Sequence, residues 1–175
     1  MSDILEIRET VQSDAAAIEL LYPEAFPDEN LLPLVGDLLR DTVIAMSLIG
    51  VINSQIVGHG IFTKCGVVGS SIKAVLLGPL AVAPAWQRKG VGSAIVRAGF
   101  RRLEEKDVAL VCVLGDPAYY RRFGFQPDAS LEPPYPLPAE WKDAWQSTSL
   151  VGIAKPVVGI LSVPPQWRKP ALWAP

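Results

Sequence analysis

The residues best placed for chemistry are two glycines and two basic side chains between an apolar run and a helical one. The stretch LAVAPAWQRKGVG (80–92) predicts a strand, a short loop, and a helix that begins directly after Gly90. The first turn of such a helix leaves backbone N–H groups unpaired, and the helix dipole adds positive potential there. Gly90 and Gly92 let a guest approach the backbone, and Arg88 and Lys89 add positive charge. The loop therefore predicts a site for an anion, most naturally a phosphate.

Two better-known phosphate loops do not fit this stretch. The dinucleotide fingerprint G-x-G-x-x-G needs a third glycine, and none follows Gly92 in register. The nucleoside-triphosphate loop ends in Gly-Lys-Ser/Thr, whereas here Lys89 precedes Gly90. An ordinary strand–loop–helix turn stays open as an alternative.

The pattern that does match is Gln/Arg-x-x-Gly-x-Gly/Ala after a strand ending in Leu-x-Val-x-Pro. It resembles the pyrophosphate loop of the GCN5-related N-acetyltransferases (the GNAT superfamily), which bind acetyl-coenzyme A. The resemblance implies that the extended backbone before the loop pairs with the pantetheine arm, and that the N–H of Val82 faces the thioester oxygen. The cofactor-binding residues expected from it are Leu80, Ala81, Val82, Gln87, Arg88, Lys89, Gly90, Val91, Gly92 and Ser93.

A second signature follows at the expected distance. The apolar run 108–114 predicts a buried strand, ended by Gly115-Asp116-Pro117. The next residues, AYYRRFGF (118–125), resemble the short helix of this superfamily that carries a tyrosine four residues before Gly-Phe, and the wording is similar to its bacterial YhbS-like subgroup. The matching residue is Tyr120, the expected general acid, because a tyrosine hydroxyl is protonated at pH 7 and can donate to a departing thiolate. A packing role for Tyr120 stays open, and Tyr119 is the lesser candidate.

No general base can be assigned from the sequence. The single histidine, His59, lies between two glycines on a predicted strand and is interpreted first as a structural residue. Glu24, Asp28 and Glu29 fall where the superfamily has its substrate-capping loop, and a solvated acidic surface is preferred for them. The asparagine usual before the tyrosine is replaced by Gly115-Asp116-Pro117, which puts one customary cofactor contact in doubt.

Periodicity and turn signals predict strands and helices of an α/β (α+β) fold in one domain over residues 1–175. The resemblance implies that the sheet is mixed, centrally splayed and of the GNAT type, flanked by helices. The Gly78-Pro79 pair would mark the splay. A cap at Ser13 or Asp14 and a stop at Pro23 bound the first helix. The expected helices are 14–22, 31–40 and 91–105, and the expected strands are 5–9, 44–52, 55–63, 75–82, 108–114, 150–153 and 157–163.

The last third has a different composition. Ten of the sixteen prolines and four of the five tryptophans lie after residue 126. Proline at this density prevents long helices, while tryptophan supplies large apolar surface, so ordered loops are expected there.

Charge and composition narrow the class of protein. The chain has 175 residues, half of them apolar, and a net charge of −2. No basic run favours nucleic acid, and no segment resembles a signal peptide or a membrane span, so a cytoplasmic protein is expected. Cys65, placed at a turn, and Cys112, placed in a buried strand, are not expected to form a disulfide, and no metal-ligand spacing is found.

The resemblance implies an acetyl-CoA-dependent N-acetyltransferase that moves an acetyl group to a primary amine of a small molecule or peptide, without a metal. Two other classes stay open. One is a non-catalytic coenzyme A-binding sensor or interaction module, and the other is a protein that binds a different nucleotide. The identity of the amine is open, as is a homodimer.

Overall fold

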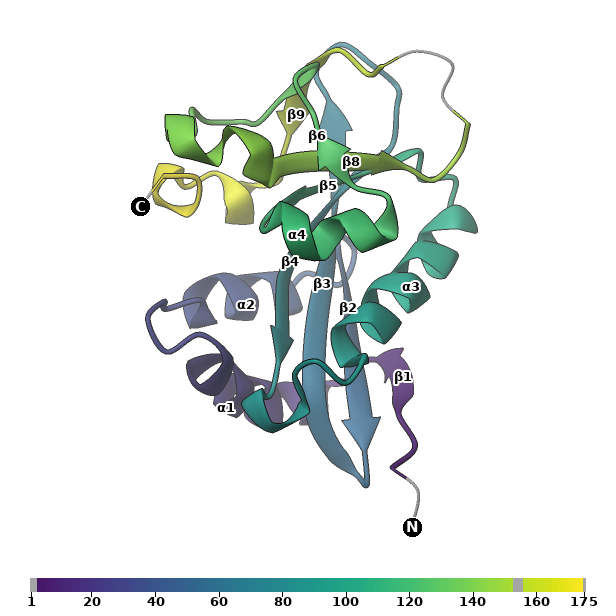
Figure 1. Cartoon of the computed structure of the whole chain (residues 1–175), viewed down its shortest axis with the longest axis vertical. Coiled ribbons are helices and arrows are strands. Elements are labelled where there is room, and N and C mark those ends of the chain that lie inside the picture. Colours follow the sequence, from purple (N-terminus) through teal and green to yellow (C-terminus); the bar gives the residue numbers. More distant parts are fainter. Residues whose placement is uncertain (1–2, 153–155, 175) are drawn as a thin grey trace. The chain divides into compact units, whose positions relative to one another are not determined.

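The computed structural model describes residues 3–152 and 156–174 (Figure 1). The helices are α1 (Ala15–Ala25), α2 (Leu32–Leu39), α3 (Val91–Glu104) and α4 (Pro117–Tyr120). The strands are β1 (Glu6–Glu9), β2 (Ala45–Ile52), β3 (Gln55–Val67), β4 (Ala74–Val82), β5 (Leu110–Leu114), β6 (Gln126–Pro127), β7 (Leu131–Glu132), β8 (Trp145–Ser149) and β9 (Gly159–Ser162). Short 3-10 turns η1–η6 cover Gln12–Asp14, Pro84–Trp86, Arg121–Phe123, Ala139–Ala144, Pro165–Trp167 and Pro170–Leu172.

The chain forms two compact units. The first contains the residues up to Phe62 together with Gly78–Arg101, and the second contains Thr63–Leu77 and the residues from Arg102 onward. Strands β3 and β4 each contribute residues to both units. The single domain over residues 1–175 stays a prediction.

The first unit is built on β1, β2 and β3. Strand β1 pairs antiparallel with β2, beginning with Glu6 opposite Val51. Strand β2 turns into β3 through Asn53 and Ser54, whose φ values are 50° and 65°. Two consecutive positive φ values are typical of the type I′ hairpin turn, which confirms the hairpin predicted at these residues.

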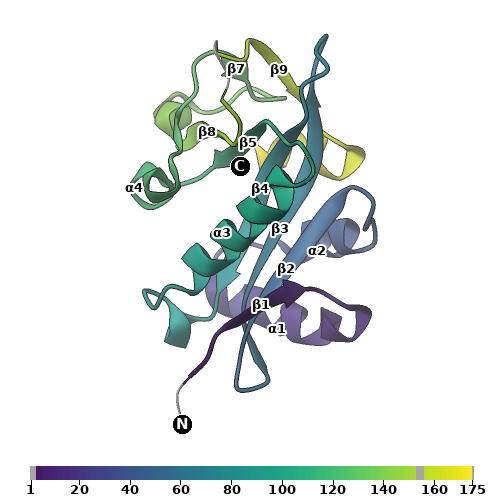
Figure 2. The ribbon, with the colours of Figure 1, turned by 90° about the vertical axis from the view of Figure 1, so that its right-hand side faces the viewer.

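Helices cover both faces of this part of the sheet. In Figure 2, α3 lies on one side of β2 and β3, and α1 and α2 lie on the other. The alternation along β3 permits this arrangement. A Cβ added to Gly58 would lie 2.7 Å from a Val91 methyl, and one added to Gly60 would lie 2.9 Å from an Ile95 methyl. Glycine at both positions therefore lets α3 approach β3, while His59 between them points to the side of α1.

The second unit contains the parallel pair of the sheet. Residues 74–77 of β4 pair in parallel with residues 110–113 of β5. Strand β8 pairs antiparallel with β5, and β6 pairs antiparallel with β8. Strand β9 pairs with the end of β3 and with β7. The sheet is thus mixed and mostly antiparallel, which confirms the predicted class, and the β4–β5 pairing ends directly before Gly78-Pro79, where the opening was predicted.

The C-terminal segment is ordered by tryptophans, as its composition predicts. The Trp173 ring lies 5.8 Å from Trp145 and 5.9 Å from Trp167, measured between ring centroids. Each indole N–H has an acceptor: the Leu131 carbonyl for Trp145, the Thr63 hydroxyl for Trp167, and the Trp167 carbonyl for Trp173. These rings form the apolar core beneath the proline-rich loops.

The end of helix α1 differs from the prediction. It continues through Pro23 to Ala25, because a proline in the last turn removes only one hydrogen bond and the next one forms, from Phe26 N to Tyr22 O at 2.8 Å. At the other end, Asp14 occupies the N-cap position, one of the two predicted, but its side chain makes no capping hydrogen bond to the helix.

Two further expectations are wrong. The first closing strand lies at Trp145–Ser149 and not at 150–153; residues 150–152 are not in a strand, and residue 153 is outside the described residues. Its polar sequence WQSTS lacks the apolar signal on which the prediction relied. Cys65 lies within β3 and not at a turn, because β3 continues to Val67, where Gly66 pairs with Ser162.

Candidate functional site

The predicted anion loop lies between β4 and α3 in the first unit. Strand β4 ends at Val82, a 3-10 turn covers Pro84–Trp86, and α3 begins at Val91. The side-chain amide of Gln87 donates to the Val82 carbonyl at 3.1 Å, which ties the loop back to the strand. The loop therefore follows a fixed path from the strand into the helix.

Gly90 gives this loop an open side. Its φ is +86°, a conformation that favours glycine, and no heavy atom outside its immediate neighbours lies within 4 Å of the position of an added Cβ. The amide of Ala94 donates to the Gly90 carbonyl at 3.0 Å. The four amides before Ala94 have no acceptor within the part of the chain that the structure describes; they are those of Gly90, Val91, Gly92 and Ser93. Free donors thus converge at an open helix start.

The charge around the loop favours an anion. Arg88 and Lys89 are exposed, and the segment from residue 83 to residue 93 contains no carboxylate. The Lys89 ammonium lies 5.1 Å from the centre of the Trp86 ring, within the range of a cation–π contact. Two cations and the helix dipole act in the same direction, so the loop suits a group with the charge and oxygen atoms of a pyrophosphate.

The residues expected to pair with an extended ligand lie in β4. Ala81 is buried, and Leu80 and Val82 are half-buried. The Ala83 amide donates to the Val57 carbonyl at 2.9 Å, which joins the end of β4 to β3. The structure places Leu80, Ala81 and Val82 directly before the loop, as predicted, and their contact with a cofactor stays a prediction.

Tyr120 lies at the end of α4 in the second unit. Asp116 caps this helix, since its carboxylate accepts a hydrogen bond from the Ala118 amide at 2.9 Å, and Pro117 occupies the first helical position. The Tyr120 ring packs edge-on against Tyr119 and Phe125, with ring centroids 5.0 and 5.7 Å away. The predicted short helix is confirmed.

The Tyr120 hydroxyl has the protonation state that an acid needs. Burial first, and then repulsion by the ionised forms of Tyr119 and Asp116, raise the pKa of Tyr120 above its ordinary value of 10. The hydroxyl has no hydrogen-bond partner among residues 3–152 and 156–174. The group is therefore a neutral donor at physiological pH whose proton is not already engaged by the described chain.

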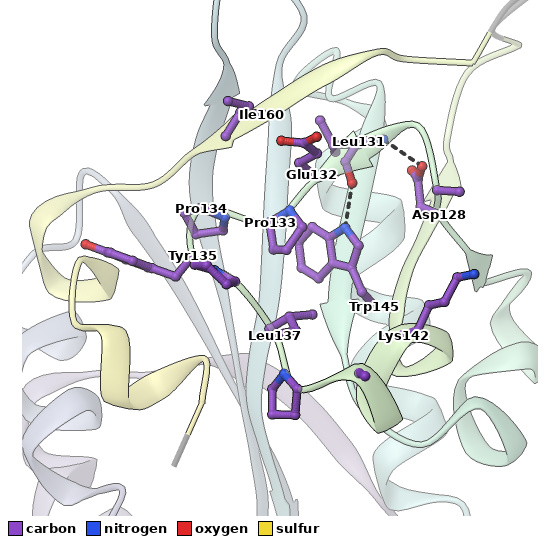
Figure 3. Close-up of a pocket in the computed structure, with 14 residues that line it drawn as sticks. Asp128, Leu131, Glu132, Pro133, Pro134, Tyr135, Leu137, Lys142, Trp145 and Ile160 are labelled. Carbon is purple, nitrogen blue, oxygen red and sulfur yellow. Dashed lines mark hydrogen bonds between the residues drawn. The ribbon is translucent and has the colours of Figure 1, made fainter.

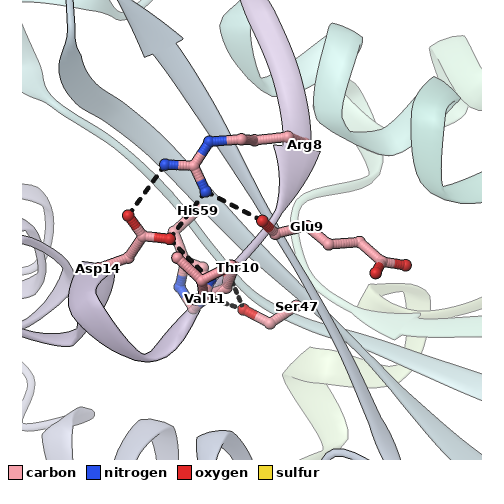
Figure 4. A network of polar contacts seen from close by, with 7 residues as sticks. All are labelled: Arg8, Glu9, Thr10, Val11, Asp14, Ser47 and His59. Carbon is pink, nitrogen blue, oxygen red and sulfur yellow. Dashed lines mark hydrogen bonds and ion pairs between the residues drawn. The ribbon is translucent and has the colours of Figure 1, made fainter.

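His59 is held between hydroxyl groups of the first unit, of which Figure 4 draws those of Ser47 and Thr10. It is 0 % exposed, and the Tyr22 hydroxyl lies 2.7 Å from its Nδ1. The Ser47 hydroxyl lies 2.7 Å from its Nε2 and 2.6 Å from the Thr10 hydroxyl. Burial lowers the pKa of His59 to about 3. A neutral imidazole with both nitrogens engaged and no exposed surface supports the structural interpretation over a role as general base.

An ion pair beside these hydroxyl groups holds the start of α1. The Arg8 guanidinium contacts both carboxylate oxygens of Asp14, at 2.8 and 3.0 Å, and the Val11 amide donates to the same carboxylate at 2.7 Å (Figure 4). The hydrogen bond with Arg8 is the main cause that lowers the pKa of Asp14. Because α1 also carries Tyr22, this pair fixes the helix that supplies a partner of His59.

The acidic candidates are spread along an exposed surface. Glu24 lies in α1, and Asp28 and Glu29 lie in the segment after it, all exposed to solvent. The preferred interpretation of a solvated acidic surface agrees with this exposure.

An apolar hollow of about 600 Å³ lies in the second unit (Figure 3). The proline-rich segment 133–138 lines it together with Trp145 and Ile160, and the exposed side chains of Glu132 and Lys142 belong to its lining. Trp145 is fixed by its hydrogen bond to the Leu131 carbonyl at 2.7 Å. Sequence reasoning expected an ordered loop here and did not predict the hollow, because its wall joins segments distant in the chain.

The described residues contain no cluster of three or more His, Cys, Asp or Glu side chains that could hold a metal ion. Cys65 and Cys112 are free thiols, and burial raises the pKa of Cys65 to about 12. None of the helices described is long and apolar enough to cross a membrane.

Comparison with known proteins identifies relatives that cover more than two thirds of the chain. The acetyltransferase (GNAT) domain family matches residues 45–127. The uncharacterized N-acetyltransferase YjhQ of Escherichia coli is 36% identical over 148 residues, which are 81% of this chain and 82% of that protein. The uncharacterized N-acetyltransferase YhbS of the same organism is 33% identical over 121 residues, which are 69% and 72% of the two chains.

Two solved structures resemble the fold closely. The crystal structure of YhbS from Escherichia coli in complex with CoA matches with a TM-score of 0.86 and 28% identity, over 97% of this chain and 94% of that chain. A GNAT family acetyltransferase from Brucella melitensis in complex with acetyl-CoA matches with a TM-score of 0.75 and 25% identity, over 95% and 99% of the two chains. One of these structures contains CoA and the other acetyl-CoA, and both molecules carry a pyrophosphate of the kind that the loop between β4 and α3 suits.

Proposed function

Because this chain belongs to the GNAT acetyltransferase family, we propose that it is an acetyl-CoA-dependent N-acetyltransferase that acetylates a primary amine of a small molecule or peptide. The observation that carries the proposal is the loop between β4 and α3. Free amide donors, an open backbone at Gly90 and two cations occur together there, and a pyrophosphate matches all three.

The cofactor would lie along residues 80–82 and the loop. The backbone of Leu80, Ala81 and Val82 would pair with the amides of the pantetheine arm, as an added strand does. The amides from Gly90 to Ser93 would bind the pyrophosphate, with Arg88 and Lys89 adding charge. The Gln87 side chain already bonds Val82 O, so its part is to hold the loop. The cofactor supplies the activated acetyl group as a thioester.

Tyr120 would be the general acid. When the amine attacks the thioester carbonyl, the departing thiolate needs a proton, and the raised pKa of Tyr120 keeps a proton on the hydroxyl. His59 is not suited to take the proton of the amine, because it has no exposed surface and both ring nitrogens are engaged. The amine would therefore lose its proton through water.

The decisive experiment measures coenzyme A binding by calorimetry and acetyl-CoA turnover by thiol release, with polyamines, aminoglycosides, amino acids and peptide N-termini as acceptors. We expect Gly90→Glu to abolish binding, because a carboxylate would occupy the open space and repel the pyrophosphate. Gly69→Glu is a matched control, since Gly69 also has a positive φ of +74° and nothing within 4 Å of its Cβ position.

The Tyr120→Phe variant tests catalysis separately from binding. It keeps the ring and removes the hydroxyl, so turnover should fall by roughly 10²-fold while coenzyme A affinity changes little. Wild-type binding by Gly90→Glu would refute the loop assignment. Tight coenzyme A binding without turnover on any acceptor would favour a sensor module over an enzyme.

A further inference from the structure

A buried side chain of β8 has an unusual hydrogen-bond pattern. Gln146 is 0 % exposed, and its amide nitrogen lies 3.1 Å from the Gly115 carbonyl and 3.4 Å from the Ala144 carbonyl. These two acceptors fix which end of the carboxamide carries the nitrogen. The opposite atom, Oε1, is buried and has no hydrogen-bond partner among the described residues.

Such an arrangement is not what packing alone would select. A buried acceptor without a donor lowers stability, and an apolar side chain of similar size would avoid that loss. The amide nitrogen is therefore the informative part of Gln146. Its shorter hydrogen bond goes to Gly115, the residue that follows β5 and precedes the cap of α4.

Gly115 is held at both of its backbone groups. Its amide donates to the Ala144 carbonyl at 3.0 Å, and its carbonyl accepts from Gln146. The two groups belong to successive peptides, so without Gln146 the amide contact would still hold the peptide before Gly115, but the carbonyl of the peptide after it would lose this donor. Gln146 thus fixes the orientation of the Gly115 carbonyl at the start of the turn into α4.

The Tyr120 ring rests directly on this residue. A Cβ added to Gly115 would lie 2.4 Å from Cε2 of Tyr120, so the ring occupies the space where any other residue would place its side chain. The ring edge nearest to Gly115 is the one adjacent to the hydroxyl-bearing carbon. A small rotation of the Gly115 peptide would therefore displace the phenol.

We propose that Gln146 is a positioning residue for Tyr120, holding the Gly115 carbonyl and with it the surface on which the phenol lies. This role rests on the proposed acid function of Tyr120. It requires no contact between Gln146 and either substrate, and it accounts for an amide in a site that is otherwise suited to an apolar group.

A double-mutant cycle tests the proposal. Gln146→Leu should lower kcat for acetyl transfer by roughly 10-fold in the presence of Tyr120, the scale expected for a misplaced catalytic group, with little change in KM for acetyl-CoA. In the Tyr120→Phe background the same substitution should change kcat less than about 2-fold, because the group that it positions is gone. Equal losses in both backgrounds would overturn the proposal.

The Gln146→Glu variant adds a readout that a loss of packing would not produce. A protonated carboxyl can donate to the Gly115 carbonyl, whereas a carboxylate cannot. The ratio of its kcat to that of the wild type should therefore rise as the pH is lowered, and a constant ratio would contradict the proposal. Gln126→Leu, an exposed glutamine on neighbouring β6, is the matched control and should leave kcat unchanged.

A measurement without turnover separates this proposal from the proposed function. If the wild type acetylates no amine, the proposed function fails, and positioning is then tested from the ¹³Cζ signal of Tyr120, assigned with Tyr120→Phe. Gln146→Leu should shift that signal, and Gln126→Leu should not. An unchanged Tyr120 signal in a folded Gln146→Leu protein would overturn the positioning role by itself.

Discussion

Lowering the pH from 7.5 to 5.0 should destabilise this protein through one residue, His59. In the unfolded chain its pKa is the ordinary 6.5, and in the folded protein burial lowers it to about 3. A histidine with a lowered folded pKa contributes its full stability above pH 6.5, and this contribution decreases as the pH falls towards 3. At pH 5 the unfolded state is almost fully protonated at this site and the folded state is not. Linkage then gives a loss of about 2 kcal/mol in the free energy of unfolding.

The assay is urea unfolding followed by tryptophan fluorescence at pH 7.5 and pH 5.0. His59 is the only histidine in the chain, so no other imidazole titrates in this range. The pKa of Asp14 is lowered from 3.8, so its stabilising contribution is retained above about pH 4 and does not change between the two measurements.

His59→Gln is the control, because an amide keeps hydrogen-bonding capacity but does not titrate. Its stability at pH 7.5 should be lower than that of the wild type, but its loss between the two pH values should be smaller by about 2 kcal/mol. The single histidine also gives one Hε1 NMR signal, which should not titrate between pH 8 and pH 5 in the folded protein. A midpoint near 6.5 for that signal, or equal pH dependence in both proteins, would refute the reasoning.

Two further predictions concern packing. Gly99→Ala should destabilise the protein by about 1–3 kcal/mol, because the new Cβ would lie 2.1 Å from the Phe62 ring. The matched helical substitution Gly36→Ala should stabilise it by up to about 1 kcal/mol, because that Cβ meets only the Arg40 guanidinium at 3.6 Å. Thermal unfolding measures both variants, and a stabilised Gly99→Ala would contradict the contact with Phe62. Trp173→Ala should lower the free energy of unfolding by about 3–5 kcal/mol, since the ring is 1 % exposed and packs on two other indoles. Chemical denaturation should show a much smaller loss for Trp141→Ala, because Trp141 is half-buried. Equal losses in the two variants would argue against the tryptophan core.

Features that depend on consecutive residues could be predicted from the sequence. The hairpin at Asn53 and Ser54 and the helix start after Gly90 follow from glycine and asparagine signals that act within a few residues. The short helix carrying Tyr120 was predicted from the resemblance of residues 118–125 to the superfamily. The same locality explains the error at Pro23. The sequence identifies a residue that weakens a helix, but the consequence depends on how many hydrogen bonds remain to be lost after it.

Features formed by residues distant in the chain were not predictable in this way. The chain of hydroxyl groups around His59 joins α1, β2, β3 and the residue after β1, and its members have no common spacing. Strand β8 has a polar sequence that resembles a loop, and it is a strand because β5 and β6 pair with it on either side. A pattern-based analysis therefore placed the closing strand five residues too late, at an apolar run.

The difference between Tyr120 and Gln146 shows how the two kinds of information combine. Tyr120 belongs to a continuous segment that resembles a short helix of the superfamily, so its position could be predicted, although the surface beneath its ring could not. Gln146 lies in a strand without a local signal, 31 residues along the chain from the carbonyl that it holds. The absence of a side chain on Gly115 connects the two: it allows the ring to lie on the backbone, and the backbone must then be held by another residue. A glycine after a buried strand is thus a turn signal in the sequence, and in the structure it is the point where a distant amide is bonded and the ring of the candidate acid rests, as the proposed positioning role requires.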